Sequence, residues 1–278
     1  MSGEYPIKQM CETLAVSRSG YYDWLAADRS ARQLAEAALQ AQIQAVHEES
    51  RETYGSPRVT VALRAQGTAV GRHRVARLMR KAGLRGNQKP RFRVVTTDSR
   101  HDQPIAPNRL LGQPAPTKPD RVWVNDLTYI HTDEGWLYLA GVMDRCSRRL
   151  VGWAMGASLE TDLPLAALKM AVQQRRPAPG LIHHSDRGVQ YASGAYRDAL
   201  AVYQLVPSMS RAGNCYDNGA MEAFWSSLKK DLVHRRRFAT RAEARTAIFD
   251  YIEAFYNRSR LHSALGYKSP LDYESSLS

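Results

Sequence analysis

The sequence of residues 121–156 is RVWVNDLTYIHTDEGWLYLAGVMDRCSRRLVGWAMG, and this stretch decides the fold. It contains three segments rich in aromatic and β-branched residues, a composition typical of strands. The letters DEG join the first segment to the second, and DRCS joins the second to the third. Connections this short join antiparallel neighbours, so the stretch predicts a three-stranded antiparallel meander.

Downstream of the meander, helical and strand patterns alternate. We expect helices at about 160–176 and 193–205, strands at 180–186 and 206–210, and then two long helices near 217–236 and 240–257. Strands separated by helices add parallel pairs to a sheet. We therefore predict an α/β fold over residues 121–278, with a mixed five-stranded sheet and flanking helices like that of ribonuclease H.

Upstream of the meander, the sequence predicts a helical region over residues 1–95. From residue 54 it reads YGSPRVTVALRAQGTAVGRHRVARLMRKAGLRG, in which Ser56-Pro57 is typical of a capped helix start and Gly67 of a helix end. A second helix is expected from about 71 to 82. Two short helices joined by a tight turn predict a helix-turn-helix at about 50–86.

The charge of the chain is concentrated beside this motif. The formal net charge is +12, and residues 71–100 hold ten Arg or Lys against one acid, Asp98. Such a cluster indicates an anionic partner, and nucleic acid is the commonest. We expect the following to bind DNA: Arg72, Arg74, Arg77, Lys81, Arg91 and Arg93. The alternative is a small helical bundle with a solvated basic face.

Residues 96–120 differ from both flanking regions. They hold five of the thirteen prolines and show little periodicity, which predicts a linker. The chain has no run of 18 apolar residues and no secretory signal at its start, so we expect a cytoplasmic protein without a membrane partner. The three cysteines form no CxxC pair, which argues against a cysteine-rich zinc module.

Three carboxylates lie in positions that suggest a catalytic or metal-binding site. Asp126 lies inside the apolar strand VWVNDLTYI, Asp186 ends the strand LIHHSD, and Glu222 lies on the helix DNGAMEAFWSSLKK. A carboxylate in a buried strand is costly unless it is paired or binds a metal. If the three converge, they form a site for hard divalent cations. The alternative makes Asp126 a turn residue and Glu222 part of a solvated face. Asp144 is expected to be a turn residue.

Other polar residues flank these carboxylates. Asn218, Glu222 and Lys229 fall on one helical face, and Lys229 is well placed to hold a phosphate. Asp217 or Asn218 is the expected N-cap. In the stretch HHSDRGVQY, neighbouring strand residues point to opposite faces, so His183, His184 and Asp186 cannot all converge on one ion. We expect His184 and Asn218 to support the carboxylates from beside the metal or to face DNA.

Taken in order, several stretches resemble one family. They are YGSPRV with its helix pair, WVNDLTYI, GWLYLAGVMDRCSRRLVGW, HHSDRGVQY, SMSRAGNCYDNGAMEAFWSSLKKDL and YNRSRLHSALGYKSP. The chain resembles the OrfB-type transposases of bacterial insertion sequences, in the family numbered three, whose core is similar to that of retroviral integrases. The integrases' zinc module of two histidines and two cysteines has no counterpart here.

The resemblance implies a function and its residues. Asp126, Asp186 and Glu222 would be the catalytic, metal-binding carboxylates, with 35 residues between the second and third and Lys229 seven positions after the glutamate. The implied cofactor is two Mg²⁺ ions, for which Mn²⁺ can substitute. The implied reaction cleaves element ends to give a 3′-hydroxyl and joins it to DNA.

The resemblance also implies partners. These are the terminal inverted repeats, target DNA, further copies of the chain and the product of an upstream reading frame, alone or fused by frameshifting. The protein would associate with the bacterial nucleoid when bound to DNA. Two other functions explain part of the pattern: a non-catalytic DNA-binding regulator, and a structure-selective nuclease of the ribonuclease H type.

Overall fold

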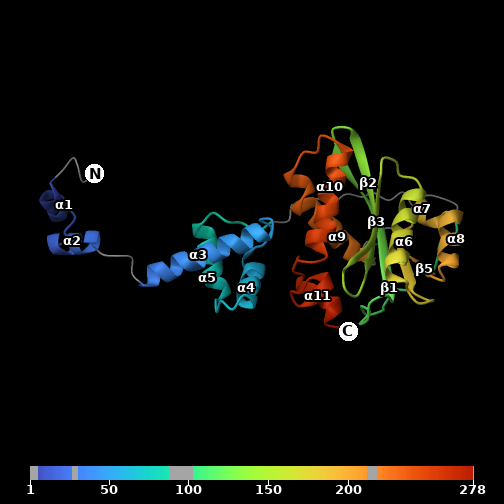
Figure 1. Cartoon of the computed structure of the whole chain (residues 1–278), viewed down its shortest axis with the longest axis horizontal. Helices are drawn as coiled ribbons and strands as arrows, with labels where there is room; N and C mark the ends of the chain where they lie inside the picture. Colours follow the sequence, from blue (N-terminus) through green and yellow to red (C-terminus); the bar gives the residue numbers. More distant parts are fainter. Residues whose placement is uncertain (1–5, 27–30, 88–102, 212–217, 278) are drawn as a thin grey trace. The chain divides into compact units, whose positions relative to one another are not determined.

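The computed structural model describes residues 6–26, 31–87, 103–211 and 218–277. The chain divides into two compact units, residues 1–85 and 86–278 (Figure 1). The boundary therefore lies ten residues before the end of the helical region predicted from the sequence. Within the described residues, no helix is both long and apolar enough to cross a membrane.

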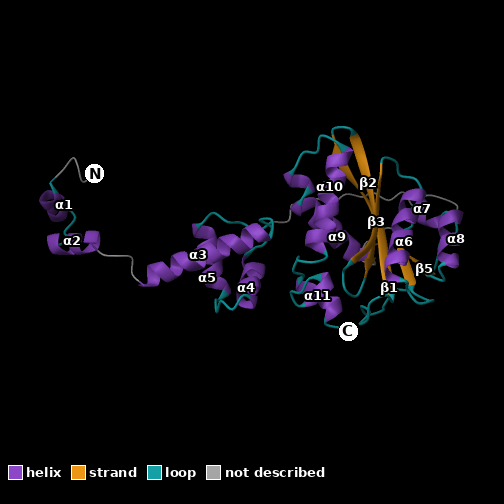
Figure 2. Cartoon of the chain, in the orientation of Figure 1, coloured by secondary structure: helices purple, strands orange, loops and turns teal. Residues whose placement is uncertain are grey.

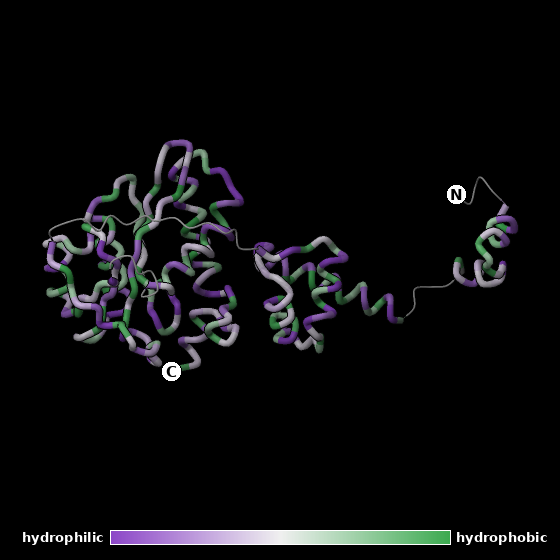
Figure 3. Tube along the Cα trace, turned by 180° about the vertical axis from the view of Figure 1, so that it is seen from behind, coloured by the Kyte–Doolittle hydropathy of each residue, from purple (hydrophilic) through white to green (hydrophobic). Residues whose placement is uncertain are grey.

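The first unit is helical in its described part. Its elements are α1 (Ile7–Thr13), α2 (Arg18–Ala26), α3 (Ala31–Glu49), α4 (Ser56–Ala65) and α5 (Arg72–Lys81). Helices α3, α4 and α5 pack together around Ile43, Val59, Leu63, Val75 and Leu78, which are completely buried. Hydrophobic and hydrophilic residues alternate along these helices in Figure 3, as expected for amphipathic helices with one buried face.

The ends of α4 and α5 match the glycine signals in the sequence, whereas the start of α4 matches only in part. Gly67 and Gly83 have φ angles of 87° and 70°, so a glycine ends each helix in the left-handed region. Helix α4 begins at Ser56, with a proline in its first turn. The expected serine cap is wrong, because the N-cap is Gly55 and makes no side-chain hydrogen bond.

The second unit contains the sheet. Its strands are β1 (Val122–Thr132), β2 (Gly135–Asp144), β3 (Leu150–Gly156), β4 (Ile182–Ser185) and β5 (Val206–Met209). Its α-helices are α6 (Asp162–Arg175), α7 (Val189–Ala192), α8 (Gly194–Val202), α9 (Gly219–Asp231), α10 (Arg241–Asp250) and α11 (Pro270–Ser275). Short 3-10 turns span Val233–Arg235 and Ser263–Leu265, and a π-helical turn spans Tyr251–Tyr256.

The five strands form one mixed sheet in the order β3-β2-β1-β4-β5. Strands β1, β2 and β3 are antiparallel neighbours, whereas β4 runs parallel to both β1 and β5. Helices cover both faces of this sheet (Figure 2). The predicted meander and the mixed five-stranded sheet are therefore confirmed.

Close contacts fix the helices on the two faces. Helix α6 lies against Gly152 of β3, where an added Cβ atom would stand 2.3 Å from the carbonyl oxygen of Ala167. Helix α9 lies against Gly141 of β2, where a Cβ atom would stand 2.8 Å from the Met221 side chain. In a strand, successive residues face opposite sides. Because Gly141 and Gly152 are offset by one position in the register, the two helices occupy opposite faces.

The helix expected near 217–236 is shorter than predicted. It ends at Asp231, whose side chain is buried and accepts hydrogen bonds from Arg260 Nε at 2.9 Å and from the Tyr251 hydroxyl at 3.1 Å. These bonds fix the end of α9 against the C-terminal helices. Tyr251 and Arg260 lie 20 and 29 residues after Asp231, so no local sequence pattern predicts these hydrogen bonds.

The described part of the predicted linker is not a free spacer. Leu110 is 6% exposed, the backbone N–H of Arg109 donates to Ser208 Oγ at 2.9 Å, and Arg145 Nη1 donates to the Pro114 carbonyl at 3.2 Å. Residues 103–120 are thus docked on the sheet unit. The rest of the predicted linker, residues 96–102, lies outside the described residues.

Candidate active site

The two aspartates of the candidate site lie on, or directly after, two neighbouring parallel strands. The last paired positions of β1 and β4 are Val124 and His184, and each aspartate lies two residues further along its own strand direction. Asp126 remains in β1, opposite Gly141 of β2, while Asp186 follows the end of β4. The parallel pairing therefore places Asp126 and Asp186 at the same end of the β1–β4 pair.

Asp126 is held by hydrogen bonds to both carboxylate oxygens. The backbone N–H of Leu127 donates to Oδ1 at 2.8 Å, and the indole N–H of Trp225 donates to Oδ2 at 2.9 Å. Burial, followed by the charge of Asp186, raises the pKa of Asp126 to about 7, and the charge of Glu222 adds to this effect. The two hydrogen bonds oppose the rise. Asp186 and Glu222 are therefore close enough for their charges to act on Asp126.

Gly141 allows α9 to reach Asp126. A Cβ atom at this position would stand 2.8 Å from Met221 and 3.0 Å from the Trp225 ring. Both side chains belong to a buried apolar stripe, together with Phe224, Leu228 and Leu232. The absent side chain at Gly141 thus lets the indole of Trp225 approach the carboxylate.

Asp186 is oriented by the turn that follows β4. Its Oδ1 accepts a hydrogen bond from the backbone N–H of Gly188 at 2.9 Å, and the side chain is half-buried. The neighbouring Arg187 Nε donates to the Ser210 carbonyl at 2.8 Å, which ties the turn to the end of β5. The Asp186 carboxylate therefore lies on a turn whose position is fixed by these hydrogen bonds.

Helix α9 contributes Glu222 and Lys229 to the candidate site. Glu222 is exposed in the first turn of the helix. Lys229 lies two turns further along, with Nζ 5.1 Å from the centroid of the Tyr129 ring. Burial lowers the pKa of Lys229, and the charge of Asp126 opposes the decrease. Electrostatic interactions thus link Lys229 to Asp126, and Asp126 to Asp186 and Glu222.

The carboxylates do not form a closed metal cage. Within the described residues, which omit 212–217 just before α9, no three His, Cys, Asp or Glu side chains are gathered closely enough to hold an ion. The donor set nevertheless suits Mg²⁺, because carboxylate oxygens are its preferred protein ligands. A cation would also offset the charges of Asp186 and Glu222, which add to the effect of burial on the pKa of Asp126.

Comparisons with known proteins give the family. The integrase core domain model matches residues 116–215 and a second model of that name matches residues 222–277, while an HTH-like domain model matches residues 33–92. The "Insertion element IS600 uncharacterized 31 kDa protein" of Shigella sonnei is 49% identical over 94% of this chain and 96% of that protein. The transposase InsF for insertion sequence IS3A of Escherichia coli (strain K12) is 40% identical over 98% of this chain and 94% of that protein.

The chain belongs to the IS3 family of insertion-sequence transposases. The predicted family is therefore confirmed, and with it an integrase core preceded by an HTH-like domain. Among solved structures, the simian T-cell lymphotropic virus intasome in complex with a PP2A regulatory subunit matches at 13% identity and a TM-score of 0.48, covering 84% of this chain and 74% of that chain. The fold of the transposase rests on its own sheet order.

Both histidines of the HHSD stretch are buried in the transposase. His184 Nδ1 lies 2.9 Å from Ser208 Oγ and Nε2 lies 3.0 Å from Ser210 Oγ, so this side chain cannot face DNA. The alternation of strand residues gave no sign that serines on and after the neighbouring strand β5 would contact His184. His183 contacts the Tyr196 hydroxyl at 3.1 Å, and burial lowers the pKa of His183 to about 3.

Asn218 of the transposase is the N-cap residue of α9, as expected, but not through its side chain. Its side chain makes no capping bond, and Nδ2 instead donates to the carbonyl of Asn125 at 2.9 Å. Asn218 is buried, so it does not face DNA either. It ties the start of the helix that carries Glu222 to the strand that carries Asp126. Asp217 lies outside the described residues.

The basic residues predicted to bind DNA have different surroundings. Arg72 and Arg74 are exposed on α5, whereas Arg77 and Lys81 both pair with Glu36 of α3. Arg91 and Arg93 lie outside the described residues. The expected basic face on α5 is present, but part of its charge is already balanced within the unit.

Sequence reasoning missed two residues of the site. Trp225 and Gly141 touch the candidate centre, one as a hydrogen-bond donor and the other through its missing side chain. The position of Trp225 one turn after Glu222 was the available signal, because residues three apart share a helical face.

Proposed function

We propose that Asp126, Asp186 and Glu222 bind two Mg²⁺ ions, for which Mn²⁺ can substitute, and that this centre transfers phosphoryl groups between DNA strands. The observation that carries the proposal is the parallel pairing of β1 and β4, which puts Asp126 and Asp186 at the same end of the two strands. Besides burial, the charges of Asp186 and Glu222 raise the pKa of Asp126, which supports the same grouping. Membership of a transposase family with an integrase core supports the same reading.

The ions would lower the pKa of the attacking water or 3′-hydroxyl and stabilise the leaving oxygen. The residues of the chain hold and orient the reacting groups. Trp225 fixes the Asp126 carboxylate, and the Gly188 N–H fixes that of Asp186. Lys229 would hold a phosphate oxygen beside the centre.

Two displacements would occur in succession. In the first, water attacks the phosphorus at the element end, the bond to the 3′-oxygen breaks, and a 3′-hydroxyl is released on the element. In the second, that hydroxyl attacks another phosphodiester and displaces the 3′-oxygen there. The first joining would link one end to the same strand beside the other end, producing an excised circle that later inserts into a target. No covalent protein intermediate is needed.

The HTH-like unit would hold DNA through phosphates. Arg72 and Arg74 are the leading candidates because both are exposed and form no ion pair within the described residues. Arg77, Lys81, Arg91 and Arg93 complete the proposed set. Two ends must meet, so we propose a homo-oligomer on the inverted repeats and the target. The product of an upstream frame, alone or fused by frameshifting, would add to it, and the DNA-bound protein would associate with the nucleoid.

The test compares two aspartate substitutions in the full chain. Asp186→Asn should abolish cleavage and joining of element-end DNA in Mg²⁺ while leaving DNA binding nearly unchanged, because one carboxylate of the centre is lost. Asp198→Asn removes an exposed carboxylate of α8 in the same unit and should keep both activities. Cleavage of donor DNA by the Asp186 variant would refute the assignment.

A second substrate separates the proposal from its rivals. A donor already cut to expose its 3′-hydroxyl should yield joined product if the protein is an active transposase. Cleavage by water alone, without joining, would indicate a nuclease. Neither product, with binding retained, would indicate a DNA-binding regulator.

A further inference from the structure

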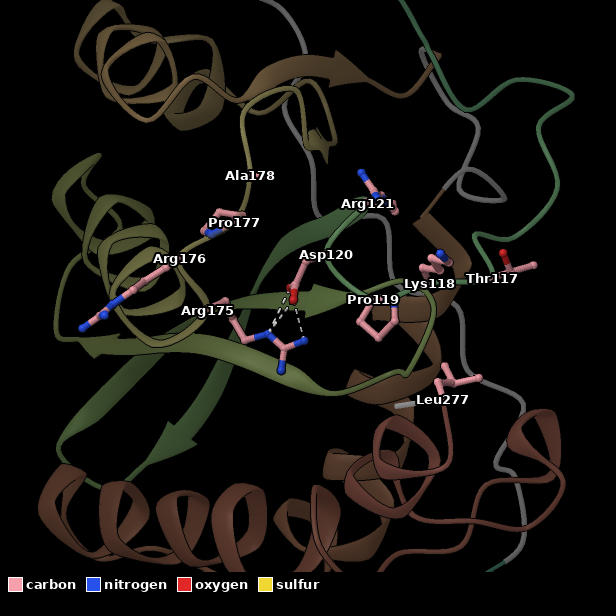
Figure 4. A pocket seen from close by; sticks show the side chains of 10 residues that line it. All are labelled: Thr117, Lys118, Pro119, Asp120, Arg121, Arg175, Arg176, Pro177, Ala178 and Leu277. Carbon is pink, nitrogen blue, oxygen red and sulfur yellow. Dashed lines mark hydrogen bonds and ion pairs between the residues drawn. The ribbon is translucent and has the colours of Figure 1, made fainter.

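A groove with a volume of about 660 Å³ opens before the first residues of β1, at the side of the sheet where the Pro-rich segment arrives (Figure 4). Its walls come from residues 117–121, from the end of α6 with the residues after it, and from Leu277. A second groove of about 650 Å³ shares Thr117 and continues along residues 109–117. The docked Pro-rich segment thus separates two neighbouring hollows.

The lining of the two grooves is strongly basic. Together they contain six arginines or lysines (Arg109, Lys118, Arg121, Arg145, Arg175 and Arg176) and one acid, Asp120. Lys118, Arg121 and Arg176 are exposed and form no ion pair within the described residues. In Figure 4 they project from the rim, whereas Arg175 turns inward onto Asp120.

Asp120 in the groove and Glu274 behind it are already paired with arginines. Arg175 donates to both oxygens of Asp120 at 2.7–3.1 Å and to Glu274 at 2.9 Å. Arg149 and Ser147 also donate to Glu274, each at 2.8 Å. These bonds join the start of β1, the end of α6 and helix α11 into a fixed floor. The charges of Asp120 and Glu274 are therefore balanced by Arg175 and Arg149, and the exposed cations of the rim remain available to an outside partner.

The shape of the groove favours a polyanion over a small anion. Small phosphates are usually held by converging backbone N–H groups. Here Pro114, Pro116, Pro119 and Pro177 line the walls, and proline has no N–H to donate. Recognition must therefore come from separated cationic side chains, which match the repeated phosphates of a nucleic acid strand.

The groove is distinct from the candidate active site. It lies before β1 and β4, whereas Asp186 follows β4. Five residues of extended strand separate Arg121 from Asp126, or about 17 Å. None of the three carboxylates lines either groove. A bound segment would therefore lie away from the phosphate being cut.

We propose that this groove binds the phosphate backbone of a duplex DNA segment other than the one being cut. Lys118, Arg121 and Arg176 supply the contacts, and the Pro-rich segment forms the wall between the two hollows. The site goes beyond the proposed reaction and does not depend on which residues carry it out. In an assembly that brings together two ends and a target, it provides an additional place for DNA.

The test places a photo-crosslinking amino acid at Thr117 of the full chain, because this exposed residue borders both grooves. A 40-bp duplex of random sequence should crosslink with a saturable concentration dependence. Combining Lys118→Ala, Arg121→Ala and Arg176→Gly should weaken this crosslinking about 100-fold or more at 0.1 M salt and reduce its salt slope by about three. Glycine suits position 176, whose φ is 46°.

A matched triple variant controls for charge. Replacing Lys169, Arg197 and Arg258 by alanine removes one lysine and two arginines that are exposed elsewhere in the unit and should leave the crosslink unchanged. Both triple variants should keep the wild-type melting temperature. An unchanged salt slope in the groove variant, or an equal fall in both, would overturn the proposal. A crosslink that poly-glutamate abolishes and unlabelled duplex does not would point to an acidic protein and also overturn it.

Discussion

Replacing Asp126 by asparagine should stabilise the metal-free protein at pH 8. The folded state raises the pKa of this carboxyl from 3.8 to about 7, so ionising it in place is unfavourable. At about 1.4 kcal/mol per pKa unit, this corresponds to about 4 kcal/mol. Asparagine carries no charge but can accept only one of the two hydrogen bonds from Leu127 and Trp225, which costs about 1 kcal/mol. The expected net gain is about 2–3 kcal/mol.

The pH dependence of this gain follows from the sign of the shift. An acid whose pKa is raised on folding contributes stability below its unfolded pKa and loses it as the pH rises through the folded value. The wild type should therefore lose stability between pH 4 and 7, in chelator, relative to the variant. The advantage of Asp126→Asn should shrink to less than about 1 kcal/mol at pH 5.

Urea denaturation in EDTA at pH 5 and pH 8 measures these differences, with Asp198→Asn as the exposed control. Mg²⁺ at 100 times its dissociation constant should add about 2.7 kcal/mol to the wild type and much less to the Asp126 variant. A destabilised variant at pH 8, or a gain independent of pH, would refute the reasoning that burial and the neighbouring carboxylates make the charge of Asp126 unfavourable.

Further predictions concern packing and DNA contacts. Asp231→Ala leaves Arg260 buried without its ion pair, and urea denaturation should show a loss of about 3–5 kcal/mol; a loss below about 1 kcal/mol would contradict this. Gly152→Ala should cost about 1–3 kcal/mol by forcing α6 from the sheet, whereas Gly194→Ala, with no atom within 4 Å, should be neutral or stabilising. Lys229→Gln should reduce the salt slope of DNA binding by about one, and an unchanged slope would argue against a phosphate contact.

The strands of this fold are readable from sequence because their signals are local. Residues 121–156 carry three apolar runs and two short turns. The register of β1 on β2 follows from the two-residue turn, Asp133 and Glu134, that connects them. The position of Asp126 inside an apolar run is equally local. A charged group among apolar neighbours is unfavourable, and this alone marks the residue as a candidate.

The contacts of each candidate residue involve residues distant in the sequence, so the sequence alone could not predict them. His184 appeared free to accompany Asp186, but Ser208 of the neighbouring strand β5 and Ser210 just after that strand contact both of its ring nitrogens. Asn218 satisfies the usual preferences for a cap, yet its side chain reaches a strand carbonyl 93 residues earlier. In both cases the deciding partner lies on another element, and no spacing rule connects the two.

The ion-pair network beneath the basic groove has a consequence for synthesis on the ribosome. Glu274 accepts hydrogen bonds from Arg149 and Arg175, which the ribosome makes about a hundred residues earlier. Domains generally fold as units while the chain is being synthesised, the N-terminal one first. The helical unit has all of its residues at 85, but the sheet unit keeps two half-buried arginines without this carboxylate until residue 274 emerges. A nascent chain can therefore present its folded helical unit to DNA before its sheet unit is complete.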